Sequence, residues 1–211
     1  MKLDTKKQPT SRMGARAGEI YQCAAELIVE KGFGHATIAE IARRMGMTKA
    51  GLYYYISSKA DMLYRIMTYG MDVVESCIVK PTQTITDPEQ RLRELIRCHA
   101  RELITRGLAI TVLIFQTNHL KPPHKEEIEA RKNAYRKYVQ ETIQQLQDLG
   151  KLRVPRVDLA ARNLLSTLRG IAYWYPLTPN VGLEDAVENT VSFILGGLLK
   201  PEYIDKGQSI A

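Results

Sequence analysis

The 211-residue sequence predicts an all-α protein of about nine helices. Apolar residues recur at helical spacing along most of the chain, and no stretch of useful length alternates with the two-residue period of a half-buried strand. Residues that favour helix starts and helix ends separate these stretches. The composition, 45% hydrophobic and 25% charged, is typical of a globular protein and excludes disordered and fibrous classes.

The first 80 residues predict a series of helices with clear boundaries. Thr37 and Glu40 match a capping box, in which the two side chains satisfy backbone amides at a helix start. Gly46 accepts a left-handed turn cheaply, and Pro81 is expected to stop a helix. We therefore expect helices over residues 12–31, 37–45, 48–55 and from Ser57 or Ser58 to residue 80.

The remaining residues predict further helices that are bounded by prolines and glycines. These helices are expected over residues 87–106, 110–118, 122–149, 158–175 and 182–199. The last two carry apolar residues on more than one face, whereas a surface helix needs only one apolar stripe. The second face is expected to pack either against a second copy of the chain or deep inside a monomer.

The two short helices on either side of Gly46 have the arrangement of a helix-turn-helix unit. The second helix of such a unit enters the major groove of DNA, where the base edges are distinguishable. Its outward residues would be Thr48, Lys49, Ala50, Gly51, Tyr53 and Tyr54. The alternative is a helical hairpin packed inside a bundle, but burying three consecutive tyrosines (53–55) would leave hydroxyls without partners at a high cost.

The segment HATIAEIARRMGMTKAGLYYYISSKADMLYRI resembles the N-terminal signature of TetR-type transcriptional regulators. The similarity covers about residues 16–66 without a gap, with Ile56 standing where the family usually has phenylalanine. The resemblance implies a homodimer with a three-helix DNA-binding head over residues 12–58. A larger body over residues 59–205 would bind a ligand and dimerise through its last two helices.

Carried over to this sequence, the family pattern assigns Thr37, Tyr54 and Lys59 to phosphate contacts. Lys49, Ala50 and Tyr53 would then face base edges and sugars. Lys49 is the best candidate for direct readout, because a lysine ammonium can donate to O6 and N7 of guanine.

The segment GIAYWYP at residues 170–176 resembles a branch of the family that represses fatty-acid or sterol-ring degradation and is released by acyl-coenzyme A thioesters. A large anionic thioester needs apolar walls and cations for its phosphates. The candidate effector-binding residues are Arg97, His99, Leu103, Phe115, Leu168, Arg169 and Trp174, with Arg101 and Arg106 as further cations. The alternative is that His99 and Trp174 are ordinary core or interface residues.

Charge and motifs limit the function further. Residues 1–60 hold ten Lys/Arg against five Asp/Glu, whereas the rest holds twenty against eighteen, so a polyanionic partner is expected for the head. No phosphate-binding loop, metalloprotease motif or nucleophile elbow is present in the sequence, so we expect no enzyme activity, cofactor or metal.

The polar N-terminus lacks the apolar core of a secretory signal, which predicts a cytoplasmic protein.

The sequence therefore predicts a homodimeric repressor that binds a palindromic operator in double-stranded DNA and is released by a small hydrophobic effector, such as an acyl-coenzyme A. A repressor of multidrug efflux that responds to hydrophobic or cationic drugs is the alternative within this class. An all-α enzyme and a scaffold without DNA binding are the alternatives from other classes.

Overall fold

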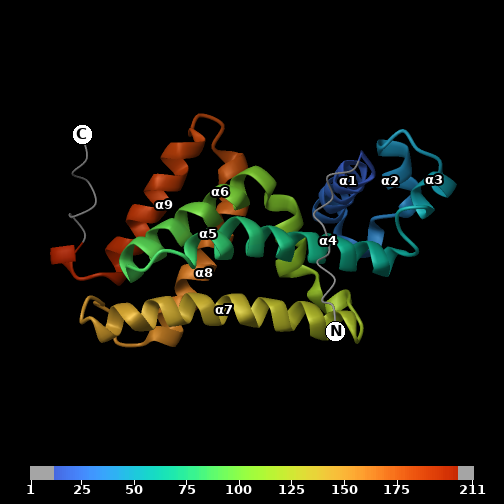
Figure 1. Ribbon diagram of the computed structural model, residues 1–211. Helices are drawn as coiled ribbons and strands as arrows, with labels where there is room; N and C mark the ends of the chain where they lie inside the picture. The colour runs from blue at the N-terminus through green and yellow to red at the C-terminus, as the bar shows by residue number, and fades with distance from the viewer. Residues whose placement is uncertain (1–11, 204–211) are drawn as a thin grey trace.

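The computed structural model describes residues 12–203, and the side chains in that range except those of residues 12–15 and 106–115. The described chain is helical and contains no strand, which confirms the predicted all-α class (Figure 1). None of its helices is long and apolar enough to cross a membrane. In chain order the principal helices are α1 (Arg12–His35), α2 (Ile38–Arg44), α3 (Lys49–Tyr53), α4 (Lys59–Val73), α5 (Lys80–Thr82), α6 (Pro88–Phe115), α7 (His124–Asp148), α8 (Val157–Trp174) and α9 (Leu183–Leu198).

The boundaries of α2, α3 and α4 are set by side chains that cap the helix starts, as the sequence predicts. The hydroxyls of Thr37, Thr48 and Ser58 accept the backbone N–H three residues further on, at 3.2, 3.0 and 3.0 Å. Gly46 lies in the turn between α2 and α3 with φ of 63°, a conformation that favours glycine. Gly32 has φ of 78° and breaks the helical path of α1 near its end.

A small apolar core fixes α1, α2 and α3 to one another, and ion pairs connect α1 with α2. Ile41 of α2, Leu52 of α3 and Ile56 are fully buried against α1 and α4. Ile56 therefore keeps the packing role expected for an apolar residue at its position. At the surface, Arg44 binds Glu30 of α1 through two hydrogen bonds of 3.0 and 2.5 Å, and Lys31 of α1 reaches Glu40 of α2 at 2.6 Å.

Two predicted helix boundaries are wrong. The helices expected over residues 87–106 and 110–118 form one continuous helix, α6, because Gly107 alone does not end a helix whose backbone bonding continues. The helix that starts at Lys59 also does not stop before Pro81. It continues through a π-helical turn, η1 (Val74–Val79), into α5, where Pro81 occupies the first helical turn and its missing N–H is tolerated.

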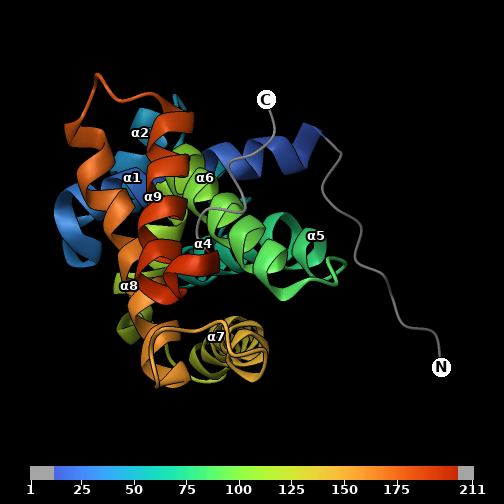
Figure 2. The ribbon, with the colours of Figure 1, turned by 90° about the vertical axis from the view of Figure 1, so that its left-hand side faces the viewer.

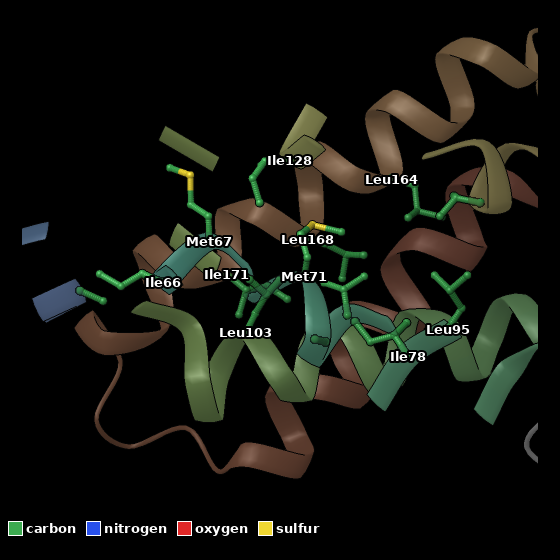
Figure 3. Close-up of a cluster of buried hydrophobic side chains, with 14 of the residues drawn as sticks. Ile66, Met67, Met71, Ile78, Leu95, Leu103, Ile128, Leu164, Leu168 and Ile171 are labelled. Carbon is green, nitrogen blue, oxygen red and sulfur yellow. The ribbon is translucent and has the colours of Figure 1, made fainter. Parts of the chain in front are cut away.

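Helix α6 lies at the centre of the body and contacts α1, α4, α7, α8 and α9. Figure 3 shows side chains from several of these helices meeting in one buried cluster; the labelled residues are Ile66, Met67, Met71, Ile78, Leu95, Leu103, Ile128, Leu164, Leu168 and Ile171. Helix α4 carries the chain from α2 and α3 into this cluster, and α1 also packs against α6, so the head and the body are in direct contact (Figure 1).

Candidate DNA-binding face, effector cavity and subunit surface

Five of the predicted DNA-binding residues are exposed on helix α3 or directly beside it. Thr48, Lys49 and Ala50 are exposed, and the side chains of Tyr53 and Tyr54 are 52% and 72% exposed. Leu52, on the opposite face of the helix, is fully buried. The exposed tyrosines contradict the alternative of a hairpin packed inside the bundle, and they leave this face open to a partner.

Gly51 lies beneath this face, where the backbone approaches its own cap. A Cβ atom at this position would lie 3.3 Å from Thr48 Oγ1 and 3.7 Å from the methyl end of Met47. The first distance is tighter than an ordinary contact, so a side chain here would require Thr48 Oγ1, which accepts the Gly51 amide, to shift by a few tenths of an ångström. The position expected for Gly51 on the DNA-binding face stays a prediction.

Lys59, expected at a phosphate, lies at the junction of α1, α4 and the short helix η2 (Thr117–His119). Its ammonium donates to the Gly34 carbonyl at 2.8 Å and lies 4.6 Å from the centre of the Phe33 ring. The ring of His119 lies against the same Phe33 ring, at 4.8 Å between centres. Thr37 is exposed nearby and caps α2.

A cavity of about 430 Å³ lies between α4, α6, α7 and α8. Two of the candidate effector residues, His99 of α6 and Arg169 of α8, line it. The other described lining residues are Met71, Val74, Glu129, Lys132, Asn133, Tyr135, Arg136, Arg162, Leu165 and Ser166. The volume is in the lower part of the range of small-molecule sites.

The other candidate effector residues with described side chains lie elsewhere. Arg97 of α6 donates to Glu188 of α9 at 2.6 and 2.9 Å and also to Glu94, and Arg101 donates to Glu184 at 2.6 Å. Two residues along a helix correspond to a rotation of about 200°, so Arg97 faces α9 whereas His99 faces α7.

The apolar candidate effector residues also lie in different parts of the structure. Leu103 and Leu168 belong to the buried core, and neither lines the cavity. Trp174, at the end of α8, is 39% exposed and lies edge-on to Tyr175 at 6.2 Å. The side chains of Phe115 and Arg106 lie outside the described residues.

Four cations line the cavity among the residues with described side chains, and the sequence predicts only one of them, Arg169. Lys132 and Arg136 are four residues apart on α7, and Arg162 and Arg169 are seven apart on α8, so each pair shares a helix face. This spacing is the feature of the sequence that could have indicated the cavity cations. The same pattern of charges around Lys132 is also typical of a solvated helix face.

The electrostatic balance of the cavity is strongly positive. Glu129 is the single acidic residue among its described lining, and it binds Lys132 at 2.9 Å. Within residues 12–203, none of Arg136, Arg162 and Arg169 forms an ion pair. A cavity with cations that lack protein counter-charges is suited to an anionic ligand.

His99 and Tyr135 form a polar pair on the cavity wall. The Tyr135 hydroxyl lies 2.8 Å from His99 Nδ1, within hydrogen-bonding distance, and the His99 side chain is buried. Burial, followed by the nearby positive charge of Arg169, lowers the pKa of His99 to about 4. Burial also raises the pKa of Tyr135, so both groups are neutral at pH 7.

This lowered pKa predicts a loss of stability in mild acid. Between pH 6.5 and pH 4 the unfolded chain protonates His99 and the folded chain does not, so the free energy of unfolding falls as the pH falls. The full effect amounts to about 3 kcal/mol. Urea unfolding at pH 7 and pH 4.5, at one protein concentration, should show a steeper loss for the wild type than for His99→Gln. Equal losses in the two proteins would contradict this assignment.

Helices α8 and α9 lie side by side (Figure 2). Their side chains form an apolar groove on the surface. The groove has a volume of about 750 Å³ and includes Leu159, 47% exposed, and Phe193, 71% exposed. Gly196 and Gly197 also line the groove and leave the α9 backbone accessible. The inner faces of both helices are buried in the core, so the outer apolar face has no partner within the described chain.

A helix-turn-helix head joined by one long helix to a larger helical body with a cavity is the architecture of a ligand-responsive transcription regulator. Comparison of the sequence with protein families agrees. Residues 86–198 match the tetracyclin repressor-like, C-terminal domain, and residues 20–66 match the bacterial regulatory proteins of the tetR family. The chain belongs to the TetR family and is a DNA-binding regulator of transcription.

Individual relatives extend this result. The transcriptional activator FasR of Mycolicibacterium smegmatis is 28% identical over 87% of this chain and 83% of its own. The transcriptional repressor KstR2 of the same organism is 24% identical over 96% of this chain and 98% of its own. The structure of AibR in complex with isovaleryl coenzyme A and operator DNA superimposes with a TM-score of 0.75 at 30% identity, covering 84% of this chain and 97% of AibR.

Proposed function

We propose that the protein is a homodimeric repressor whose operator binding is relieved by an acyl-coenzyme A thioester. Residues 12–58 bind double-stranded DNA, and residues 59–205 bind the effector and dimerise through α8 and α9. The exposed face of α3 supports the first assignment, and the apolar groove between α8 and α9 supports the second. The proposed function consists of binding DNA and an effector, and it involves no catalysis. The sequence contains no catalytic motif.

The observation that carries the effector class is the set of cations around the cavity. Lys132, Arg136, Arg162 and Arg169 offer charge to phosphates, while Met71 and Val74 supply apolar wall for an acyl group. AibR, which was solved with isovaleryl coenzyme A, shares the fold. A cationic drug would meet repulsion here, so the cavity disfavours the alternative of a multidrug-efflux repressor.

Helix α4 supplies the physical connection between effector and DNA. Its first residue, Lys59, lies at the head, and Met71, three turns further along, lines the cavity together with Val74. In the DNA-binding shape the two α3 helices of a dimer would be about 34 Å apart, one turn of DNA. An effector that binds more tightly to a shape with another position of α4 weakens DNA binding. The size of this effect is the difference between the effector's binding free energies for that shape and for the DNA-binding shape, typically about 1–3 kcal/mol.

Fluorescence anisotropy tests this function. The purified protein is titrated onto DNA from upstream of its own gene, with and without isovaleryl coenzyme A. We expect sequence-selective binding that the thioester weakens by about 5- to 150-fold. Free coenzyme A and isovalerate are the controls for the two halves of the effector.

A charge variant tests the assignment of the cavity. Arg136→Gln with Arg162→Gln should raise the thioester concentration needed for release and leave the affinity for operator unchanged. Arg153→Gln, which changes an arginine outside the cavity lining, is the matched control. An unchanged thioester response in the double variant would contradict the assignment.

A further inference from the structure

A second cavity, of about 320 Å³, adjoins the first one. Among the described side chains, three line both cavities: Met71 of α4, Val74 of η1 and Tyr135 of α7. These side chains therefore form a partition between the two spaces. The second cavity is otherwise lined by Glu75, Val79, Arg131, Ala134 and Tyr138.

Of the three partition residues, Tyr135 has the largest and stiffest side chain. Its hydroxyl is held by His99 Nδ1 at 2.8 Å, and the two rings meet edge to face with centres 5.5 Å apart. Met71, by contrast, has a flexible side chain that adapts to its surroundings. The hydrogen bond to His99 thus fixes the one side chain that most obstructs passage from the first cavity to the second.

The two cavities differ in what they can bind. The first has four cations in its lining, whereas Arg131, the cation of the second, is bound to Asp72 at 2.7 Å and to Glu75 at 3.4 Å. Val79 and Ala134, together with the rings of Tyr135 and Tyr138, give the second cavity apolar walls. The second cavity is therefore suited to hydrocarbon and not to phosphate.

We propose that Tyr135, held by His99, determines acyl-chain length: it restricts the effector to short acyl groups by closing the first cavity off from the second. This inference rests on the proposed acyl-coenzyme A effector. A short acyl group ends against the Tyr135 ring within the cavity of about 430 Å³. A longer chain enters the second cavity only when the ring is removed, and there it contacts the π-helical turn at Glu75 and Val79.

The test is a comparison of effector chain lengths by isothermal titration calorimetry on the full-length protein without DNA. Isovaleryl, octanoyl and lauroyl coenzyme A are titrated into the wild type and into Tyr135→Ala. We expect the wild type to bind the isovaleryl thioester most tightly. In Tyr135→Ala the affinity for the octanoyl thioester should rise by about tenfold or more, because additional methylenes leave water.

Two matched variants separate the effect of the Tyr135 ring from the effect of its hydroxyl and from the effect of a neighbouring side chain. Tyr135→Phe keeps the ring but loses the hydrogen bond to His99, so its preference for the short thioester should lie between those of the wild type and of Tyr135→Ala. Tyr138→Ala enlarges the second cavity one helical turn further on without opening the partition, so it should keep the full preference. If Tyr135→Ala does not fold by circular dichroism, Tyr135→Leu removes the ring with a smaller loss of volume.

The outcomes distinguish this inference from the proposed function. Equal binding of long and short thioesters by the wild type, or an unchanged preference in the ring-deleted variant, overturns the role of Tyr135 and leaves the effector class standing. Absence of binding of every thioester by the wild type overturns the effector class and this inference together.

Discussion

Phe193→Glu is expected to convert the dimer into a monomer. The phenylalanine side chain is 71% exposed in the single chain and lines the groove between α8 and α9, so its replacement leaves the fold of each subunit intact. In a two-fold symmetric interface the change occurs twice, and each copy would place a charge in an apolar contact. A loss of about 2 kcal/mol per copy weakens dimerisation by roughly a thousandfold.

Sedimentation velocity at micromolar concentration measures this change directly. Leu149→Glu is the matched control, because Leu149 is 57% exposed at the end of α7 and does not line the groove. Operator affinity should fall together with dimerisation in Phe193→Glu and remain unchanged in the control. A wild type that is already monomeric at this concentration would refute the proposed interface.

The double replacement Lys49→Ala and Tyr54→Ala is expected to abolish specific operator binding. Lys49 is exposed on α3 and Tyr54 is exposed directly after its end, so neither side chain contributes to the core of the head. A base contact is worth about 1–3 kcal/mol, and a dimer on a palindromic site makes each contact twice. We expect a loss of at least about a hundredfold in affinity on the operator.

Anisotropy on operator DNA and on a scrambled duplex separates specific from general binding, and sedimentation confirms that the variant remains a dimer. Lys137→Ala is the matched control, because the Lys137 side chain is 76% exposed on α7, far along the chain from the head. Unchanged operator binding in the double variant would favour a scaffold function over a DNA-binding one.

The head was predictable from sequence because its determinants are local. A threonine cap and the amide that it accepts are three residues apart, and the left-handed turn at Gly46 depends on one residue's lack of a side chain. These features need no knowledge of tertiary packing. The family resemblance, which also depends on this segment, then implied the overall fold.

The cavity was only partly predictable because it forms where distant helices meet. Arg97 and Arg169 are both arginines on amphipathic helices, yet one is neutralised by Glu188 of α9 and the other lines the cavity. Whether such an arginine is neutralised or lines the cavity depends on which helix packs against its face. The residue pattern along one helix does not show this. The continuous helix α6 and the helical turn at Pro81 are not predicted for related reasons: packing overrides the weak local preference of Gly107, and Pro81 lies in a first helical turn, where its missing N–H is tolerated.

The position of Lys59 has a consequence for the thermodynamics of DNA binding. A free lysine side chain loses about 2 kcal/mol of conformational entropy when it is fixed on a partner. Here the Gly34 carbonyl and the Phe33 ring already hold the ammonium in the protein without DNA. Part of this entropy is therefore lost during folding, and less remains to be lost when Lys59 binds a DNA phosphate. The same Phe33 ring contacts His119, which links the order of this lysine to the position of the body's η2 turn.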